Sequence, residues 1–95
     1  MAKRKNNELT SEMLRLREEI TTIGPMMRGS VTVMGEKNKQ PYFSVGIKGK
    51  TKVIYLGDKR AEIAREYTAN YKRFLDVVEK MTIINMDLLK SMKTK

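Results

Sequence analysis

The side chains that most often perform catalysis are missing from this sequence. Histidine, cysteine and tryptophan are absent from its 95 residues, so it lacks the commonest general base, the thiol nucleophile and the usual transition-metal ligands. Glu62 and Glu66 lie one helical turn apart and could hold a divalent ion weakly, but such carboxylates are more typical of a solvated helix face. The Gly-Lys-Thr at residues 49–51 lacks the glycine spacing of a phosphate-binding loop. We therefore expect no enzyme, no metal site, no cofactor and no small-molecule substrate.

Basic residues are the chemistry that the sequence does offer. Lysine and arginine number 20 against 11 acidic residues, which gives a net charge of +9. Residues 28–60 carry eight basic groups against two acidic ones, whereas acids outnumber bases in residues 8–23. A surplus needed only for solubility would have little reason to cluster in this way. The excess predicts a polyanionic partner, and nucleic acid is the commonest.

The candidate binding residues are the basic, hydroxyl-bearing and tyrosine side chains of this middle segment. Lysine and arginine can neutralise phosphates, serine and threonine can donate to phosphates or base edges, and tyrosine can donate or stack on bases. The candidates are Arg28, Ser30, Thr32, Lys37, Lys39, Tyr42, Ser44, Lys48, Lys50, Thr51, Lys52 and Tyr55. A single lysine could be ordinary solvated surface, and the tyrosines could instead pack on a neighbouring subunit. The interpretation therefore depends on the cluster.

Three strands are expected to position these side chains. Residues 30–34, 41–48 and 51–56 alternate in polarity, and Gly49-Lys50 matches a two-residue hairpin turn, which would pair Lys48 with Thr51 and Phe43 with Leu56. Side chains alternate between the two faces of a strand. One face is then apolar: Val31, Val33, Phe43, Val45, Ile47, Ile54 and Leu56, with Lys52 at its turn end. The other is polar and basic: Arg28, Ser30, Thr32, Tyr42, Ser44, Lys48, Thr51, Val53 and Tyr55.

Two helices flank the strands. Residues of about 7–23 carry an apolar stripe and end at Gly24-Pro25, where glycine and proline stop a helix. The stripe is Leu9, Met13, Leu16, Ile20 and Ile23. Residues of about 58–92 show a heptad pattern typical of a helical hairpin or coiled coil. Its two series are Tyr67, Phe74, Met81 and Leu88, and Ile63, Asn70, Val77 and Ile84.

The predicted fold class is α+β: an N-terminal helix, a three-stranded antiparallel meander over about 29–57, and a long C-terminal helix forming a coiled-coil-like helical hairpin. We expect one domain over 7–92, a flexible basic arm over 1–6 in which Lys3, Arg4 and Lys5 could contact nucleic acid, and a frayed tail over 93–95. No stretch approaches the roughly 18 apolar residues of a membrane span, and the N-terminus does not resemble a signal peptide. The lack of cysteine fits a cytoplasmic protein.

The lengths of the two helices predict self-association. At 1.5 Å per residue the first helix spans about 25 Å and the second about 50 Å, so we expect residues 77–92 to remain uncovered. An exposed apolar stripe there would favour a homodimer. The candidate dimerisation residues are Val77, Val78, Met81, Ile84 and Leu88. Alternatively, the helix could break near Thr82 and fold back.

Two parts of the sequence resemble known protein families. Residues 42–57, a hairpin running into a helix, resemble AP2-type and phage-integrase arm-binding domains, which place a three-stranded sheet in the major groove. Residues 16–89 are similar to a family of small prokaryotic proteins of unknown function, often described as transposase-related. The matching pieces lie at 23–30, 41–43, 49–51 and 70–74. Members of that family usually carry a cysteine cluster between the first two strands, where this chain has 35–39 without cysteine.

The sequence therefore predicts a non-enzymatic DNA-binding protein that uses a basic sheet face. The resemblance implies only a mobile-element setting, and we expect an accessory protein or transcriptional regulator linked to a mobile element or phage. Two alternatives remain: an RNA-binding protein with the same basic residues, or a protein-interaction adaptor that acts through the long C-terminal helix.

Overall fold

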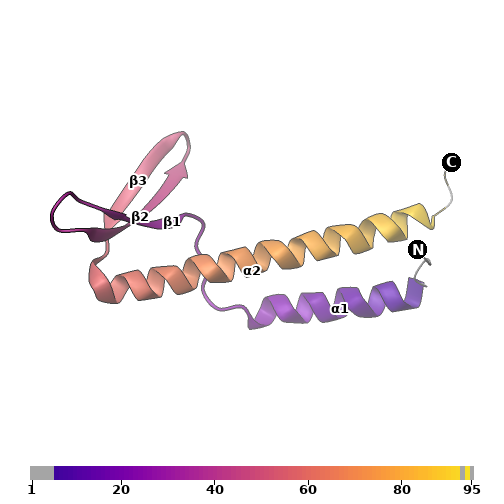
Figure 1. Ribbon diagram of the computed structural model, residues 1–95. Helices are drawn as coiled ribbons and strands as arrows, with labels where there is room; N and C mark the ends of the chain where they lie inside the picture. Colours follow the sequence, from indigo (N-terminus) through magenta and orange to yellow (C-terminus); the bar gives the residue numbers. More distant parts are fainter. Residues whose placement is uncertain (1–5, 93, 95) are drawn as a thin grey trace. The chain divides into compact units, whose positions relative to one another are not determined.

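The computed structural model describes residues 6–92 and residue 94, and this part of the chain forms two helices and one three-stranded sheet (Figure 1). In chain order the elements are α1 (Asn6–Thr22), β1 (Ser30–Met34), β2 (Gln40–Ile47), β3 (Lys50–Tyr55) and α2 (Gly57–Lys90). The predicted α+β fold is confirmed, with every boundary within two residues of its expected place. The basic side chains expected in an N-terminal arm, Lys3, Arg4 and Lys5, lie outside the described residues.

The chain divides into two compact units that share α2. The sheet unit runs from Gly24 to Lys72 and contains all three strands with the first half of α2. The helical unit combines α1 and Ile23 with the second half of α2, from Arg73 onward. No described helix carries an apolar stretch long enough to cross a membrane.

In the sheet unit, β2 lies between β1 and β3, and both pairings are antiparallel. Phe43 pairs with Val31 on one side and with Ile54 on the other. The hairpin turn between β2 and β3 consists of Lys48 and Gly49, because Ile47 pairs with Lys50. The expected Gly49-Lys50 turn is therefore wrong. Lys48 and Gly49 have φ angles of 51° and 78°, and a type I′ turn requires positive φ at both central residues.

This correction moves the β2–β3 register by two residues and leaves the faces of the strands unchanged. Because the side-chain period of a strand is two, a two-residue shift keeps each residue on its expected face. Phe43 and Val45 still share a face with Ile54 and Lys52, which are now their direct partners. At the tip, Lys50 moves from the turn into β3, where it pairs with Ile47.

The core of the sheet unit forms between this face and α2. Phe43, Leu56, Ala61 and Ala64 are buried together, and the half-buried Met27, Val31 and Val45 pack against them. Alanine at positions i and i+3 of α2 allows the helix to approach the sheet closely. The linker that precedes β1 is held by α2 as well. The Met27 N–H donates to the Tyr67 carbonyl over 3.1 Å, and the Asn70 amide donates to the Pro25 carbonyl over 2.8 Å.

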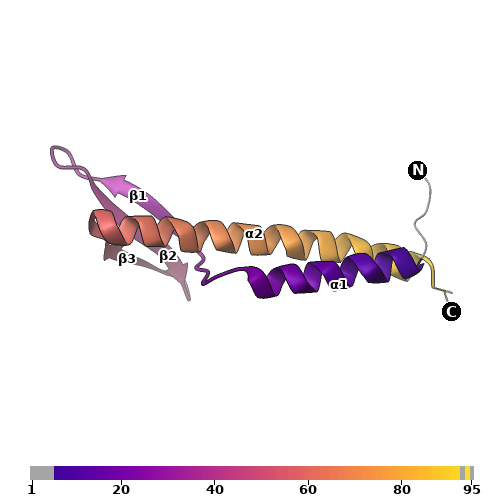
Figure 2. The same cartoon turned by 90° about the horizontal axis from the view of Figure 1, so that it is seen from below.

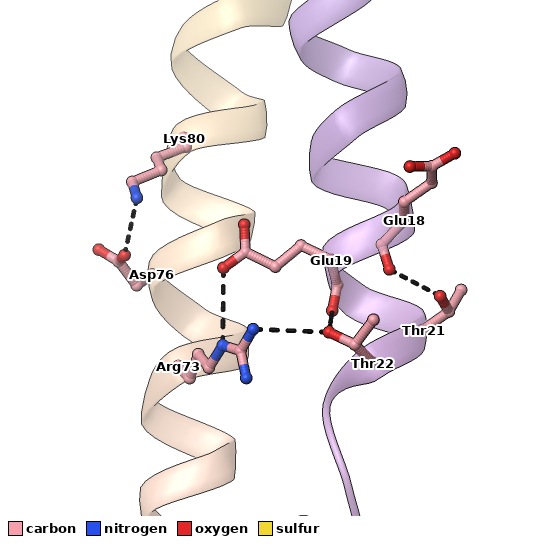
Figure 3. A network of polar contacts seen from close by, with 7 residues as sticks. All are labelled: Glu18, Glu19, Thr21, Thr22, Arg73, Asp76 and Lys80. Carbon is pink, nitrogen blue, oxygen red and sulfur yellow. Dashed lines mark hydrogen bonds and ion pairs between the residues drawn. The ribbon is translucent and has the colours of Figure 1, made fainter.

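In the helical unit, α1 lies antiparallel beside the second half of α2 (Figures 1 and 2). Leu9 of α1 and Val77 and Ile84 of α2 are buried here. A polar contact lies at the Thr22 end of α1 (Figure 3): Arg73 forms an ion pair with Glu19 over 3.5 Å, and its guanidinium also donates to the Thr22 hydroxyl. The hydroxyls of Thr21 and Thr22 donate to carbonyls of the last turn and so help to end α1.

This arrangement corrects the expectation about residues 77–92. Val77 and Ile84 have exposed fractions of 0% and 4%. These two predicted dimerisation residues are therefore already buried by packing within the chain. Met81 and Leu88 are half-buried, and Val78 is exposed. Val77 and Ile84 are covered because α1 packs beside the second half of α2 and not beside the first. The helix is continuous through Thr82, so the alternative of a break there is wrong as well.

Candidate nucleic-acid interface

Four basic side chains gather at the end of the sheet that carries the β2–β3 turn. Lys48 lies in the turn itself, and Lys50 and Lys52 follow in β3, opposite Ile47 and Val45. All three lysines are exposed. Because side chains alternate along a strand, Lys50 and Lys52 point to the same face as Phe43. Arg28 joins them from a distant part of the sequence, and we call this group the tip cluster: Arg28, Lys48, Lys50 and Lys52.

A hydrogen bond places Arg28 in the cluster. Its guanidinium donates to the carbonyl oxygen of Gly46 over 2.8 Å, and Gly46 lies two residues before Lys48 in β2. Arg28 thus stabilises the backbone beside the turn while its side chain stays exposed. No acidic residue occurs between 20 and 35 or between 37 and 57, the segments that hold Arg28 and the three lysines. The tip cluster therefore has a local charge of +4 with no carboxylate in its own segments.

Lys37 and Lys39 lie at the other end of the sheet. They belong to the connection between β1 and β2, whereas the tip cluster surrounds the connection between β2 and β3. Since β2 has eight residues at about 3.3 Å each, the two connections are about 25 Å apart. The predicted single cluster of basic residues is therefore divided between the two ends of the sheet. Glu36 and Asp58 flank this far end, so its charge is mixed.

The face of the sheet opposite Phe43 is not basic. The strand residues on it are uncharged: Ser30, Thr32, Met34, Gln40, Tyr42, Ser44, Thr51, Val53 and Tyr55. Tyr42 and Tyr55 pack on each other edge to face, with ring centroids 5.4 Å apart, and the Tyr55 hydroxyl donates to the Gln40 side chain over 3.1 Å. The basic residues predicted on this face, Arg28 and Lys48, lie outside the strands, before β1 and in the β2–β3 turn. Lys50 and Lys52 lie on the Phe43 face.

Exposed apolar side chains accompany the tip cluster. Ile47 and Ile54 lie on the Phe43 face with Lys50 and Lys52, and both are exposed. The sequence predicts core positions for these two residues and for Val33, which is exposed as well, so all three predictions are wrong. Ile47 lies beside the turn, whereas Ile54 pairs with Phe43 farther along β3. The tip therefore offers positive charge interleaved with apolar surface.

Acidic side chains do not gather into a cluster in the described part of the chain. Within residues 6–92 and 94, no three acidic side chains lie close enough together to hold a metal ion. Arg60, another exposed basic residue near the sheet, lies away from the β2–β3 turn, where its guanidinium donates to the carbonyls of Leu56 and Tyr55 over 2.8 Å each. It is therefore not part of the tip cluster.

No protein-family model matches the chain, and no curated protein or solved structure is significantly similar to it. The resemblances to AP2-type domains and to the transposase-related family stay predictions.

Proposed function

We propose that this protein is a non-enzymatic DNA-binding protein whose contact surface is the tip of the β2–β3 hairpin. The observation that carries the proposal is the meeting of Arg28 with Lys48, Lys50 and Lys52 at one end of the sheet, fixed by the bond from Arg28 to Gly46. A two-stranded ribbon fits the major groove of B-DNA, which is about 12 Å wide. In that groove the four cations would neutralise phosphates on either side of the ribbon.

The apolar part of the tip supports the same proposal. Ile47 is exposed and pairs with Lys50 beside the turn, and apolar side chains in the major groove contact the methyl group of thymine. The lysines would supply affinity that is independent of sequence, because phosphate contacts position a protein without reading bases. A cytoplasmic regulatory or accessory role is part of this proposal, and its setting at a mobile element rests on the sequence resemblance.

The test compares two variants that lose equal charge at opposite ends of the sheet. The tip variant carries Lys48→Gln, Lys50→Gln and Lys52→Gln, and the control carries Lys37→Gln, Lys39→Gln and Lys59→Gln. All six lysines are exposed, and glutamine keeps most of the side-chain stem. Binding to a fluorescent DNA duplex is measured by anisotropy. We expect a large loss of affinity in the tip variant and a small loss in the control.

Equal losses in the two variants would mean that the total charge, and not the tip, determines binding. The choice between DNA and RNA is tested by competition in the same assay. We expect unlabelled duplex DNA to displace the probe at a lower concentration than single-stranded RNA does. The reverse order would indicate that the protein binds RNA. In that case the stacking of bases on tyrosines such as Tyr55 would contribute to affinity.

A further inference from the structure

The second half of α2 carries an apolar stripe that packing with α1 leaves exposed. Leu75, Val78, Met86 and Leu89 have exposed fractions of 46%, 37%, 50% and 64%, and Thr82 lies midway between them. At 3.6 residues per turn these five side chains fall within an arc of about 80° around the helix. The buried residues Val77 and Ile84 lie on a different arc, so this exposed stripe is a separate surface of the same helix.

The spacing of the stripe is symmetric about its centre. The steps from Leu75 to Leu89 are three, four, four and three residues, so each apolar residue before Thr82 has a counterpart at the same distance after it. Such a stripe is complementary to its own reversed copy. If two of these helices meet antiparallel with Thr82 against Thr82, Leu75 lies opposite Leu89 and Val78 opposite Met86.

We propose that this stripe binds a second copy of the chain in an antiparallel two-fold contact centred on Thr82. An interface with two-fold symmetry uses the same patch on both partners, and a stripe with symmetric spacing meets that condition along its whole length. A parallel contact fits the sequence less well. The regular alternation of three and four residues that a parallel pair requires would place the polar Asn85 in the seam and leave Met86 beside it.

The central threonine is suited to burial. Its hydroxyl donates to the Val78 carbonyl over 2.9 Å within the same helix, so a partner that covers Thr82 leaves no donor unsatisfied. The remaining surface of this side chain is a methyl group. A seam with Thr82 at its centre is therefore apolar from Leu75 to Leu89. This inference concerns the helical unit and is independent of the DNA contact proposed for the sheet unit.

The absence of cysteine allows a direct test of the register. Three single variants, Thr82→Cys, Leu75→Cys and Leu89→Cys, are treated with a short thiol-specific cross-linker, and Ser11→Cys on the exposed side of α1 is the matched control. Only Thr82→Cys lies on the proposed two-fold axis. We expect it to form a covalent dimer by itself, whereas Leu75→Cys and Leu89→Cys should cross-link when mixed with each other. Efficient cross-linking of Leu75→Cys and of Leu89→Cys alone would indicate a parallel contact and overturn the proposal.

A second measurement does not depend on cysteine chemistry. In the Thr82→Glu variant, two like charges would face each other across the axis, and we expect the dimer dissociation constant to rise more than about tenfold. Ser11→Glu should leave it unchanged. Sedimentation equilibrium reports the change against the monomer mass of 11.0 kDa, and circular dichroism verifies that both variants stay helical. A wild-type protein that remains a monomer at every concentration, or a Thr82→Glu variant that dimerises like wild type, would refute the proposal.

Discussion

Replacement of Gly29 by alanine tests the packing of the sheet unit most severely. Gly29 has a φ of 140°, a conformation that is essentially restricted to glycine, and a Cβ atom there would lie 2.4 Å from Cζ of Phe43 and 2.8 Å from the Ser44 carbonyl oxygen. Phe43 is buried at the centre of the core, so its ring has little room to move. The new methyl group must therefore displace either the ring or the backbone.

The expected cost follows from these two effects. The φ angle alone costs about 1–3 kcal/mol for a residue other than glycine. Displacement of the Phe43 ring adds part of the roughly 3–5 kcal/mol that complete loss of a buried phenylalanine would cost. We expect Gly29→Ala to lower the free energy of unfolding by at least about 3 kcal/mol. A chain of this length has about 5 to 14 kcal/mol in total, so the loss is large.

Urea unfolding followed by far-ultraviolet circular dichroism measures this loss. At an m value of about 2 kcal/mol/M, the midpoint should fall by about 1.5 M. Gly46→Ala is the matched control, because no atom lies within 4 Å of a Cβ at that position. It should stay within about 0.5 kcal/mol of wild type. If the two variants unfold at the same urea concentration, the close approach of Gly29 to Phe43 is wrong.

Two further substitutions test the helical unit and the hairpin turn. Val77→Ala should lower the free energy of unfolding by about 2 kcal/mol because Val77 is fully buried, whereas the exposed Val78→Ala should cost less than about 1 kcal/mol; urea titration at low protein concentration compares them. Lys48→Asn should raise the thermal midpoint and stabilise the protein by about 0.5 kcal/mol, because Asn-Gly is the preferred type I′ turn. A lower midpoint for Lys48→Asn would contradict the turn assignment.

The strand faces could be predicted from the sequence because they depend only on a period of two. The turn was misplaced by one residue and the pairing by two, yet Phe43, Val45 and Lys52 lie on their expected face. The helices were equally predictable, since an apolar stripe and a Gly-Pro stop are local signals. The order of the elements was sufficient to define the fold class.

The sequence could not predict which half of α2 packs on the sheet and which half packs on α1. Ala61 and Ala64 bind the sheet, but alanine among charged residues gives a weak apolar signal beside the large side chains of the heptad series. We therefore assigned the first half of the helix to α1. Val77 and Ile84 were therefore predicted to be exposed and are buried, whereas the exposure of Val78, Met86 and Leu89 agrees with the predicted free apolar stripe.

The binding site was predicted in composition but not in arrangement. The lysines of 48–52 were identified from charge alone, whereas Arg28 reaches them through a contact across the sheet that no local pattern reveals. The separation of Lys37 and Lys39 from the tip follows from antiparallel topology, because successive connections of a meander lie at opposite ends. The number of charges in a segment does not show that Lys37 and Lys39 lie away from the tip cluster.

The salt dependence of duplex DNA binding tests the central proposal most directly. Each phosphate contact contributes about 0.9 to the slope of log K against log salt, so loss of the three tip lysines should reduce the slope by about 2.7 and the affinity at 0.1 M salt by up to roughly 500-fold. The control variant at Lys37, Lys39 and Lys59 should keep a slope within about one unit of wild type. Equal reductions of slope in the two variants would contradict the assignment of DNA binding to the hairpin tip.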